Sequence, residues 1–199
     1  LDAATFTGEE HVDVTVHQAT DTVVLHALDL ALDEVWFEQG GRRLDATAAL
    51  DAEAETATLA LTDTLEPGPA TFHARFTGEL NDKLVGFYRS TFTADDGAVR
   101  TIACTQFEST HARRAFPCWD EPDFKAVFGV TLIVESHLLA VSNGREVSPS
   151  GSEKTADAVW FWPRATGDSA TPVSSSRLVL TAGSDGPPCG LCTTTSPEG

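Results

Sequence analysis

Alternating apolar and polar residues restrict the fold of this chain more than any other feature of its sequence. Within residues 11–17, valine occupies every second position, at Val12, Val14 and Val16. Successive side chains of a β-strand point to opposite faces, so this spacing predicts a strand that buries one face. Similar short runs follow at 22–25, 27–32, 35–38, 58–61, 70–76, 86–92, 128–134 and 138–142.

Turn-forming residues separate these runs and indicate the fold class. They are Gly40-Gly41, Pro67-Gly68-Pro69, Asp95-Asp96-Gly97 and Asn143-Gly144. Short strands with turns at this spacing are typical of an antiparallel β-sandwich, so we expect an all-β fold. Residues 46–55 are alanine-rich but carry no apolar stripe, which leaves a loop and a strand as alternatives. One short helical turn is predicted over residues 110–115, because Pro117 follows and cannot continue a helix.

The acidic balance of the 199 residues argues against one class of partner. The formal charge is -17, whereas binding to a phosphate backbone requires a basic face, so we expect no nucleic-acid partner. No apolar run approaches the roughly 20 residues of a membrane-spanning helix, and no membrane insertion is expected. The N-terminus lacks a basic and then apolar leader, which favours the cytoplasm. The chain begins with Leu1 rather than Met, so a removed leader stays an open alternative.

The four cysteines do not form the pattern of a disulfide framework, because they are few and unevenly spaced for a chain of this length. We expect Cys104 and Cys118 to be small buried apolar residues rather than a bridge. Cys189 and Cys192 form a lone Cys-x-x-Cys pattern with no second pair and no nearby histidine. Its role as half of a zinc knuckle, as a redox pair or as neither stays open.

Residues 105–122 form a segment dense in polar groups, Thr-Gln-Phe-Glu-Ser-Thr-His-Ala-Arg-Arg-Ala-Phe-Pro-Cys-Trp-Asp-Glu-Pro. The segment is too irregular for a strand, and so many hydrogen-bonding groups are typical of a site or a corner. Together with residues 81–90 and 124–128, it resembles the N-terminal domain of zinc aminopeptidases of the aminopeptidase N type. These are gluzincins and include the puromycin-sensitive and membrane alanyl aminopeptidases. The resemblance implies a saddle-like antiparallel β domain with one loop at a catalytic cleft.

This resemblance also divides the chain. Residues 1–147 are expected to form the aminopeptidase-like β domain, and residues 148–164 an uncertain continuation. Residues 165–199 contain no aromatic residue and are rich in Ser, Thr, Gly and Pro, which predicts an irregular tail. A truncation, a fusion and a reading-frame change are the alternatives for this abrupt change of composition.

The substrate-binding residues follow from the resemblance. An aminopeptidase must hold the free α-ammonium of its substrate, and a rigidly placed carboxylate is suited to this task. By resemblance, Glu108 would bind the peptide N-terminus, and Gln106 would line the pocket for the first side chain. The alternative is that both side chains only tie the loop backbone together.

Charged residues later in the same segment have a structural interpretation. Arg113 and Arg114 have the guanidinium groups that suit carboxylates and phosphates. Asp120 and Glu121 follow closely in the sequence and are expected to neutralise them. We therefore favour ion pairs that fix the loop over an anion-binding site.

Two motifs of these enzymes are missing from the sequence. No histidine begins the His-Glu-x-x-His spacing that places two imidazoles on one helical face for zinc. The Gly-x-Met-Glu-Asn motif is also missing, because the chain contains no methionine. We therefore expect no metal site, no cofactor and no catalytic residue in this chain. The resemblance assigns zinc to a catalytic domain that is missing or supplied by a separate chain.

The leading hypothesis is a substrate-anchoring N-terminal domain of a zinc aminopeptidase that releases N-terminal amino acids from peptides, with no activity of the chain alone. One alternative is a non-catalytic β-sandwich module that binds a peptide or protein. Another is a truncated or frame-shifted gene product. The preferred substrate side chain, the oligomeric state and the compartment of the intact protein stay open.

Overall fold

The structure, a computed structural model, describes residues 4–122, 124, 126–134, 140–142, 145–150, 153–158 and 175–182. Nearly all of the regular structure there is β, as expected. The strands are β1 (Thr5–Val16), β2 (Thr20–His26), β3 (Leu30–Gln39), β4 (Arg42–Asp51), β5 (Thr56–Leu65), β6 (Gly68–Glu79), β7 (Gly86–Thr93), β8 (Val99–Gln106), β9 (Val127–Ile133), β10 (Arg145–Ser150), β11 (Glu153–Ala158) and β12 (Ser175–Ala182). A single 3-10 turn, η1 (Ala112–Arg114), lies where the helical turn was predicted.

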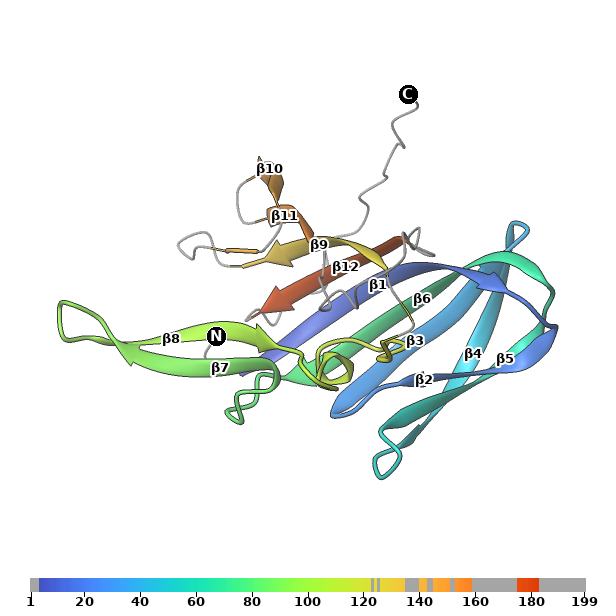
Figure 1. Cartoon of the computed structure of the whole chain (residues 1–199), viewed down its shortest axis with the longest axis horizontal. Helices are drawn as coiled ribbons and strands as arrows, with labels where there is room; N and C mark the ends of the chain where they lie inside the picture. The colour runs from blue at the N-terminus through green and yellow to red at the C-terminus, as the bar shows by residue number, and fades with distance from the viewer. Residues whose placement is uncertain are drawn as a thin grey trace.

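Ten of these strands form one sheet, in the order β10-β11-β9-β12-β1-β6-β3-β4-β5-β2. Neighbouring strands are antiparallel except β9 and β12, which are parallel. The strands β7 and β8 form a separate two-stranded sheet. They extend from one end of the larger sheet as an arm (Figure 1).

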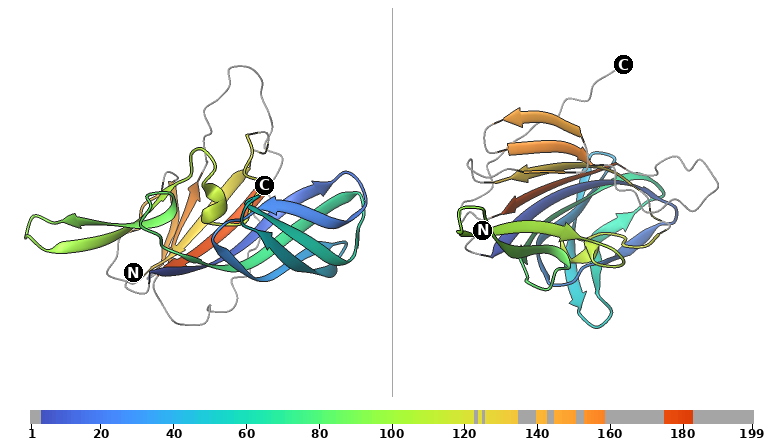
Figure 2. Two further views of the ribbon diagram at one scale, coloured as in Figure 1. Left: turned by 90° about the horizontal axis from the view of Figure 1, so that it is seen from below. Right: turned by 60° about the vertical axis from the view of Figure 1, so that its left-hand side comes forward.

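The large sheet is curled into a half-barrel. Strands β1 and β2 are joined by residues 17–19 alone, although β6, β3, β4 and β5 separate them in the sheet. Five strand spacings in a flat sheet amount to about 24 Å, whereas a link of this length spans at most about 14 Å. The sheet must therefore bend back on itself, and the two views of Figure 2 show this curl.

The inner face of the curl holds the core, which is built from the apolar positions of the alternating pattern. Its largest fully buried side chains include Phe6, Phe37, Phe72 and Phe76. The core also contains the smaller buried residues Leu25, Ala27, Leu30, Val35, Leu44, Ala57, Leu59, Leu65, Ala70, Ala74 and Leu80. The half-barrel thus has one continuous hydrophobic interior.

Two glycines leave room for phenylalanine rings close to the backbone of the neighbouring strand. Gly8 on β1 is paired with Phe76 on β6, and Phe6 on β1 is paired with Gly78 on β6. A Cβ atom added to Gly8 would overlap the ring of Phe76, and one added to Gly78 would overlap the ring of Phe6. Each ring therefore covers the glycine opposite, as in the aromatic rescue of glycine in sheets.

The hairpin between β3 and β4 has the turn that its sequence predicts. Gly40 and Gly41 have φ of 58° and 76°, and Gln39 pairs with Arg42 across the turn. Positive φ at both central residues is the requirement of the type I′ turn, which matches the twist of the strands. Glycine adopts this conformation without a steric penalty.

Several strand boundaries differ from those expected. Residues 30–32 of the predicted run 27–32 and the whole run 35–38 belong to one strand, β3. Its pairing with β6 shifts register between Leu32 and Glu34. This irregularity interrupts the alternation and divides the sequence pattern. Residues 46–55 resolve into the end of β4 and a turn. The strand β8 was not predicted, because both of its faces are largely exposed and its sequence does not alternate.

Other differences lie towards the C-terminus. Residues 175–182 form β12, so this part of the expected irregular tail is a strand. The expected strand at 138–142 is not observed at 140–142. Residues 138–139, Asn143-Gly144, Cys189 and Cys192 lie outside the described residues. The single turn η1 is the helical element of the described segments, and none of them contains a helix able to span a bilayer.

Candidate functional site

The polar segment that follows β8 is fastened along β2, the edge strand of the half-barrel. The backbone N–H of His26 donates to the carbonyl of Cys118 at 2.8 Å, and the N–H of Cys118 donates back at 3.0 Å. The indole Nε1–H of Trp119 donates to the carbonyl of Val24 at 3.1 Å. Leu28 N–H donates to the carbonyl of Arg113 at 2.9 Å. The segment therefore has a fixed position although it has little regular structure.

Arg113 is the buried centre of this attachment, with an exposed fraction of 7%. Its Nε lies 3.0 Å from Oδ2 of Asp120, and its Nη1 lies 3.0 Å from Oε2 of Glu55. A further Nη2 hydrogen bond reaches the carbonyl of Asp120 at 3.3 Å. Arg113 thus joins the polar segment to the turn between β4 and β5.

The other charged residues of the segment lie differently. Arg114 pairs with Asp29, and its Nη2 is 4.0 Å from Oε1 of Glu55. Among the described residues, the carboxylate of Glu121 forms no ion pair with either arginine, and Glu121 is exposed. The structure therefore brings Arg113 and Asp120 together, and it adds Glu55 and Asp29, which lie 58 and 85 residues away from their partners.

Gln106 ends β8, and Glu108 follows two residues later. Both side chains are exposed. Gln106 Nε2 donates to the backbone carbonyl of Glu108 at 3.5 Å. Between them, the half-buried Phe107 packs edge-on against Phe116, with ring centroids 5.7 Å apart. Phe107 therefore anchors the loop while the amide and the carboxylate face water.

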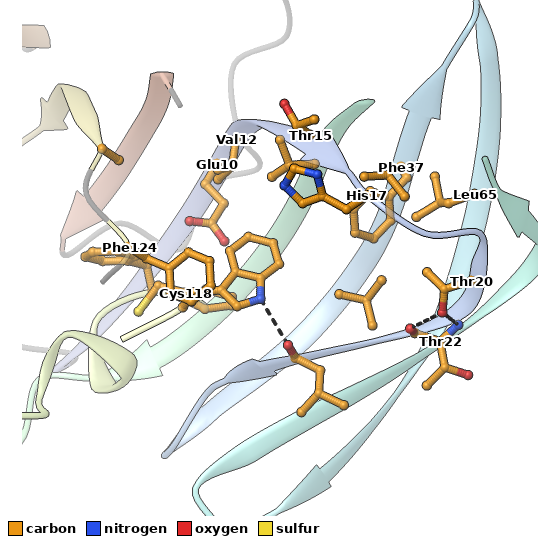
Figure 3. Close-up of a pocket in the computed structure, with 18 of the residues that line it drawn as sticks. Glu10, Val12, Thr15, His17, Thr20, Thr22, Phe37, Leu65, Cys118 and Phe124 are labelled. Carbon is orange, nitrogen blue, oxygen red and sulfur yellow. Dashed lines mark hydrogen bonds between the residues drawn. The ribbon is translucent and has the colours of Figure 1, made fainter. Parts of the chain in front are cut away.

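A separate cavity of about 550 Å³ opens into the half-barrel (Figure 3). Neither Gln106 nor Glu108 lines it. Its walls come from β1, β2, β3, the end of β5, the polar segment, the link that follows it and the start of β9. The larger apolar residues of the lining are Val12, Val14, Val16, Val23, Val24, Phe37, Leu65, Phe116, Trp119, Phe124 and Phe128. Thr15, His17, Gln18, Thr20 and Thr22 add polar groups.

Glu10 is a carboxyl group inside this largely apolar cavity. Its exposed fraction is 3%, and its Oε1 has no hydrogen-bond partner. Burial raises the pKa of Glu10 well above its usual value, because the charged form loses its hydration. Burial also raises the pKa of the neighbouring Cys118 thiol, and the carboxylates of Asp120 and Glu10 raise it further. The cavity thus favours a neutral thiol and disfavours an unpaired negative charge.

Glu10 was not among the predicted site residues, although its sequence position carries a signal. Glu10 stands two residues before Val12 and two after Gly8, in the same period-two series as the valines. On β1 the positions of this series are buried or half-buried, while those between them contact Arg75 and His73 on the outer face. A charged residue within an apolar face is the pattern that could have revealed it.

Replacing Glu10 with glutamine is expected to stabilise the fold at neutral pH and to change little near pH 4. Folding raises the pKa of Glu10 above its value in the unfolded chain. The stability that Glu10 contributes is therefore fully present below the unfolded pKa, and it is lost as pH rises through the folded pKa. Each tenfold change in the acid dissociation constant corresponds to about 1.4 kcal/mol. Urea unfolding of Glu10→Gln and of the unaltered chain, from about pH 4 to pH 8, measures the difference in their free energies of unfolding.

The exposed Glu53 supplies the matched control for this measurement. Glu53→Gln should stay within about 0.5 kcal/mol of the unaltered chain across the same pH range. A constant difference between Glu10→Gln and the unaltered chain at every pH would contradict the burial of an ionisable carboxyl group.

The cysteines and the potential metal ligands are considered next. Cys104 and Cys118 are free thiols, and both are half-buried rather than buried. Among the residues that the structure describes, no three His, Cys, Asp or Glu side chains lie close enough to hold a metal ion.

Comparison with known proteins places the chain in a family. Residues 1–164 match the model of the Peptidase M1 N-terminal domain. The chain is 39% identical to the puromycin-sensitive aminopeptidase of Caenorhabditis elegans over 184 residues, which is 92% of this chain and 19% of that protein. It is 43% identical to aminopeptidase M1-C of Oryza sativa subsp. japonica over 143 residues, 72% of this chain and 16% of that protein.

A human relative matches a similar share of the chain. The chain is 38% identical to the endoplasmic reticulum aminopeptidase 1 of Homo sapiens over 148 residues, covering 72% of this chain and 16% of that protein. The chain thus spans between 16% and 19% of the length of these curated relatives. The family match covers strands β1 to β11 and the polar segment. The chain belongs to the Peptidase M1 N-terminal domain family.

Proposed function

We propose that this chain is the substrate-anchoring part of a zinc aminopeptidase, in which Glu108 binds the free α-ammonium of a peptide and Gln106 lines the pocket for the first side chain. The observation that carries the proposal is the placement of these two side chains. They stand exposed on either side of the anchored Phe107, on a segment that Arg113 fastens to the half-barrel. A carboxylate on such a support can bind an ammonium group with little reorganisation.

The half-barrel alone offers only part of such a site. An ion pair between groups in full contact with water contributes about 0–1 kcal/mol, so Glu108 by itself would hold an ammonium weakly. A second surface that excludes water would strengthen the pair. We assign that surface to the catalytic zinc domain. Zinc, when bound there, would activate water and polarise the scissile carbonyl, whereas the residues of this chain would position the substrate.

The arm of β7 and β8 supports a contact with a further domain or chain. Its neighbourhood exposes four apolar side chains, Leu84 at 56%, Phe92 at 45%, Val99 at 72% and Ile102 at 41%. By the register of the two strands, Phe92 and Ile102 lie on one face of the arm and Val99 lies on the other. Neighbouring exposed apolar residues such as Phe92 and Ile102 are typical of an interaction surface. The same feature favours a second candidate function, a non-catalytic module that binds a peptide or protein through this arm.

The cytoplasm is our proposed compartment. The free thiols of Cys104 and Cys118 support it, because reducing compartments keep cysteines unpaired.

Binding of a free amino terminus tests the role of Glu108. Leucinamide and N-acetyl-leucinamide are titrated into the isotope-labelled full chain, and backbone amide resonances are followed by NMR. We expect leucinamide to shift the resonances around Gln106 and Glu108 with a Kd weaker than about 1 mM, and the acetylated form to leave them in place. Glu108→Gln should remove the response, whereas the control Glu53→Gln should keep it. Equal shifts from both ligands would argue against the assignment.

The chain alone is expected to have no peptidase activity. Incubating the pure chain with leucine 4-nitroanilide and zinc should release no more product than buffer does, because the two zinc-domain motifs are missing from its sequence. Hydrolysis that a chelator abolishes would contradict this prediction.

The encoding DNA distinguishes the two candidate functions. Reading it beyond the codon for Arg164 in all three frames should reveal Gly-x-Met-Glu-Asn followed by His-Glu-x-x-His if the chain is the front of an aminopeptidase. Finding neither motif would favour the binding module.

A further inference from the structure

We propose that the cavity inside the half-barrel binds a small apolar molecule carrying one ammonium group, and that Glu10 pairs with this group. This site goes beyond the proposed function, because it uses neither Gln106 nor Glu108. It lies on the inner face of the curled sheet (Figure 3), whereas Gln106 is exposed at the end of β8 and Glu108 on the loop that follows.

The size and the walls of the cavity suit a small organic molecule. Its volume of about 550 Å³ lies within the range of about 300–1,000 Å³ that is usual for ligand sites. The walls are valine and aromatic side chains, with Val14 and Phe37 from the sheet and Phe116 and Trp119 from the polar segment. The Nε1–H of Trp119 is already bonded to the carbonyl of Val24, so this donor is satisfied.

Glu10 adds a buried carboxyl group to this otherwise largely apolar cavity. Figure 3 shows its carboxyl group between two groups of side chains, with Cys118 and Phe124 on one side and Phe37 and Leu65 on the other. The side chain is 3% exposed and its Oε1 has no partner. A buried polar atom without a partner costs free energy of folding. Oε1 is covered by its neighbours in this structure, so a ligand would remove that cost by displacing a wall side chain and donating a hydrogen bond to Oε1.

The charge of the lining selects among ligand classes. None of the described residues that line the cavity is lysine or arginine, so these described walls offer an anion no opposite charge. Besides Glu10, the titratable groups of the lining are Cys118 and the exposed His17, and the ion-paired Asp120 and Arg113 both act on Cys118 from behind. The ionised form of Glu10 is therefore the unpaired charge of the described walls, and an ammonium group is complementary to it.

Pairing with an ammonium group would also ionise Glu10. An opposite charge at hydrogen-bond distance favours the carboxylate, so an amine that enters as a cation should displace the carboxyl proton to the buffer. The charge-assisted hydrogen bond then joins the ammonium N–H to Oε1. A neutral ligand of the same shape would release no proton.

Calorimetry with an amine and its neutral analogue tests the site. The full chain is titrated with 4-phenylbutylamine and with 4-phenylbutan-1-ol at about pH 6, in two buffers with different ionisation enthalpies. We expect the amine to bind at least ten times more tightly than the alcohol and to release a proton. Glu10→Gln should weaken amine binding at least tenfold, should abolish the proton release, and should leave alcohol binding within about threefold of the unaltered chain.

Two further variants separate this site from others. Val14→Phe should weaken the binding of both ligands, because the larger side chain fills part of the cavity. Glu108→Gln should leave amine binding unchanged, so failure at this site can be told from failure of the proposed peptide site. The comparison of amine with alcohol on the unaltered chain needs no variant to fold. Equal affinity for both ligands, no binding of the amine, or amine binding that survives Glu10→Gln would each overturn the proposal.

Discussion

Replacing Arg113 with methionine is expected to destabilise the folded chain by about 3–5 kcal/mol, the usual effect of removing one partner from a buried ion pair. The Arg113 side chain is 9% exposed, and that of its partner Asp120 is 10% exposed. Without the guanidinium, the Asp120 carboxylate would stay buried with no opposite charge. The tie to Glu55 would also be lost, which frees the polar segment from the turn after β4.

Chemical denaturation of the two chains measures this loss. Arg100→Met is the matched control, because Arg100 pairs with Asp96 on the surface, where the two side chains are 57% and 56% exposed. It should change stability by no more than about 0.5 kcal/mol. The double variant Arg113→Met with Asp120→Asn should recover part of the loss, since no uncompensated charge stays buried. A loss below about 1 kcal/mol for Arg113→Met would show that water reaches the pair.

Replacing Phe76 with alanine is expected to cost about 3–5 kcal/mol, as for other fully buried aromatic residues. Phe76 is 1% exposed and covers Gly8 on the neighbouring strand. Its removal opens a void in the core and uncovers the glycine backbone of β1. Thermal or denaturant unfolding gives the value.

The contact between Gly8 and Phe76 makes a double-mutant cycle informative. Gly8→Ala alone should cost about 1–3 kcal/mol, because the new methyl group overlaps the ring. In the Phe76→Ala background the same change should be neutral or stabilising, since the methyl group then enters the void. Additive effects of the two substitutions would mean that the ring does not occupy the space above Gly8.

Period-two patterns predicted the strands whose two faces differ most. The alternation at Val12, Val14 and Val16 marks β1 because its inner face is shielded and its outer face is charged. The glycine pair at 40–41 marked its hairpin for a local reason, the need for positive φ. Both signals act over a few residues, so a single sequence contains them.

Features that depend on distant residues were not predictable in the same way. Within the described segments, the strand β8 pairs with β7 alone and is largely exposed on both faces, so no burial pattern was imposed on it. The partners Glu55 and Asp29 lie far along the chain from Arg113 and Arg114. The curl that creates the cavity depends on the order of six strands. Gln106 and Glu108 entered through the family resemblance, because nothing in their local pattern marks a substrate site.

The position of β1 has a consequence for synthesis of the protein. Strand β1 leaves the ribosome before both of its partners, because β6 begins only at Gly68 and β12 begins at Ser175. At about 5–20 residues per second, β1 waits several seconds with unpaired backbone groups. His11 and Asp13 interrupt its valines, and such gatekeeper residues oppose pairing between nascent chains. The outer face of β1 would therefore protect the chain from aggregation before the half-barrel exists.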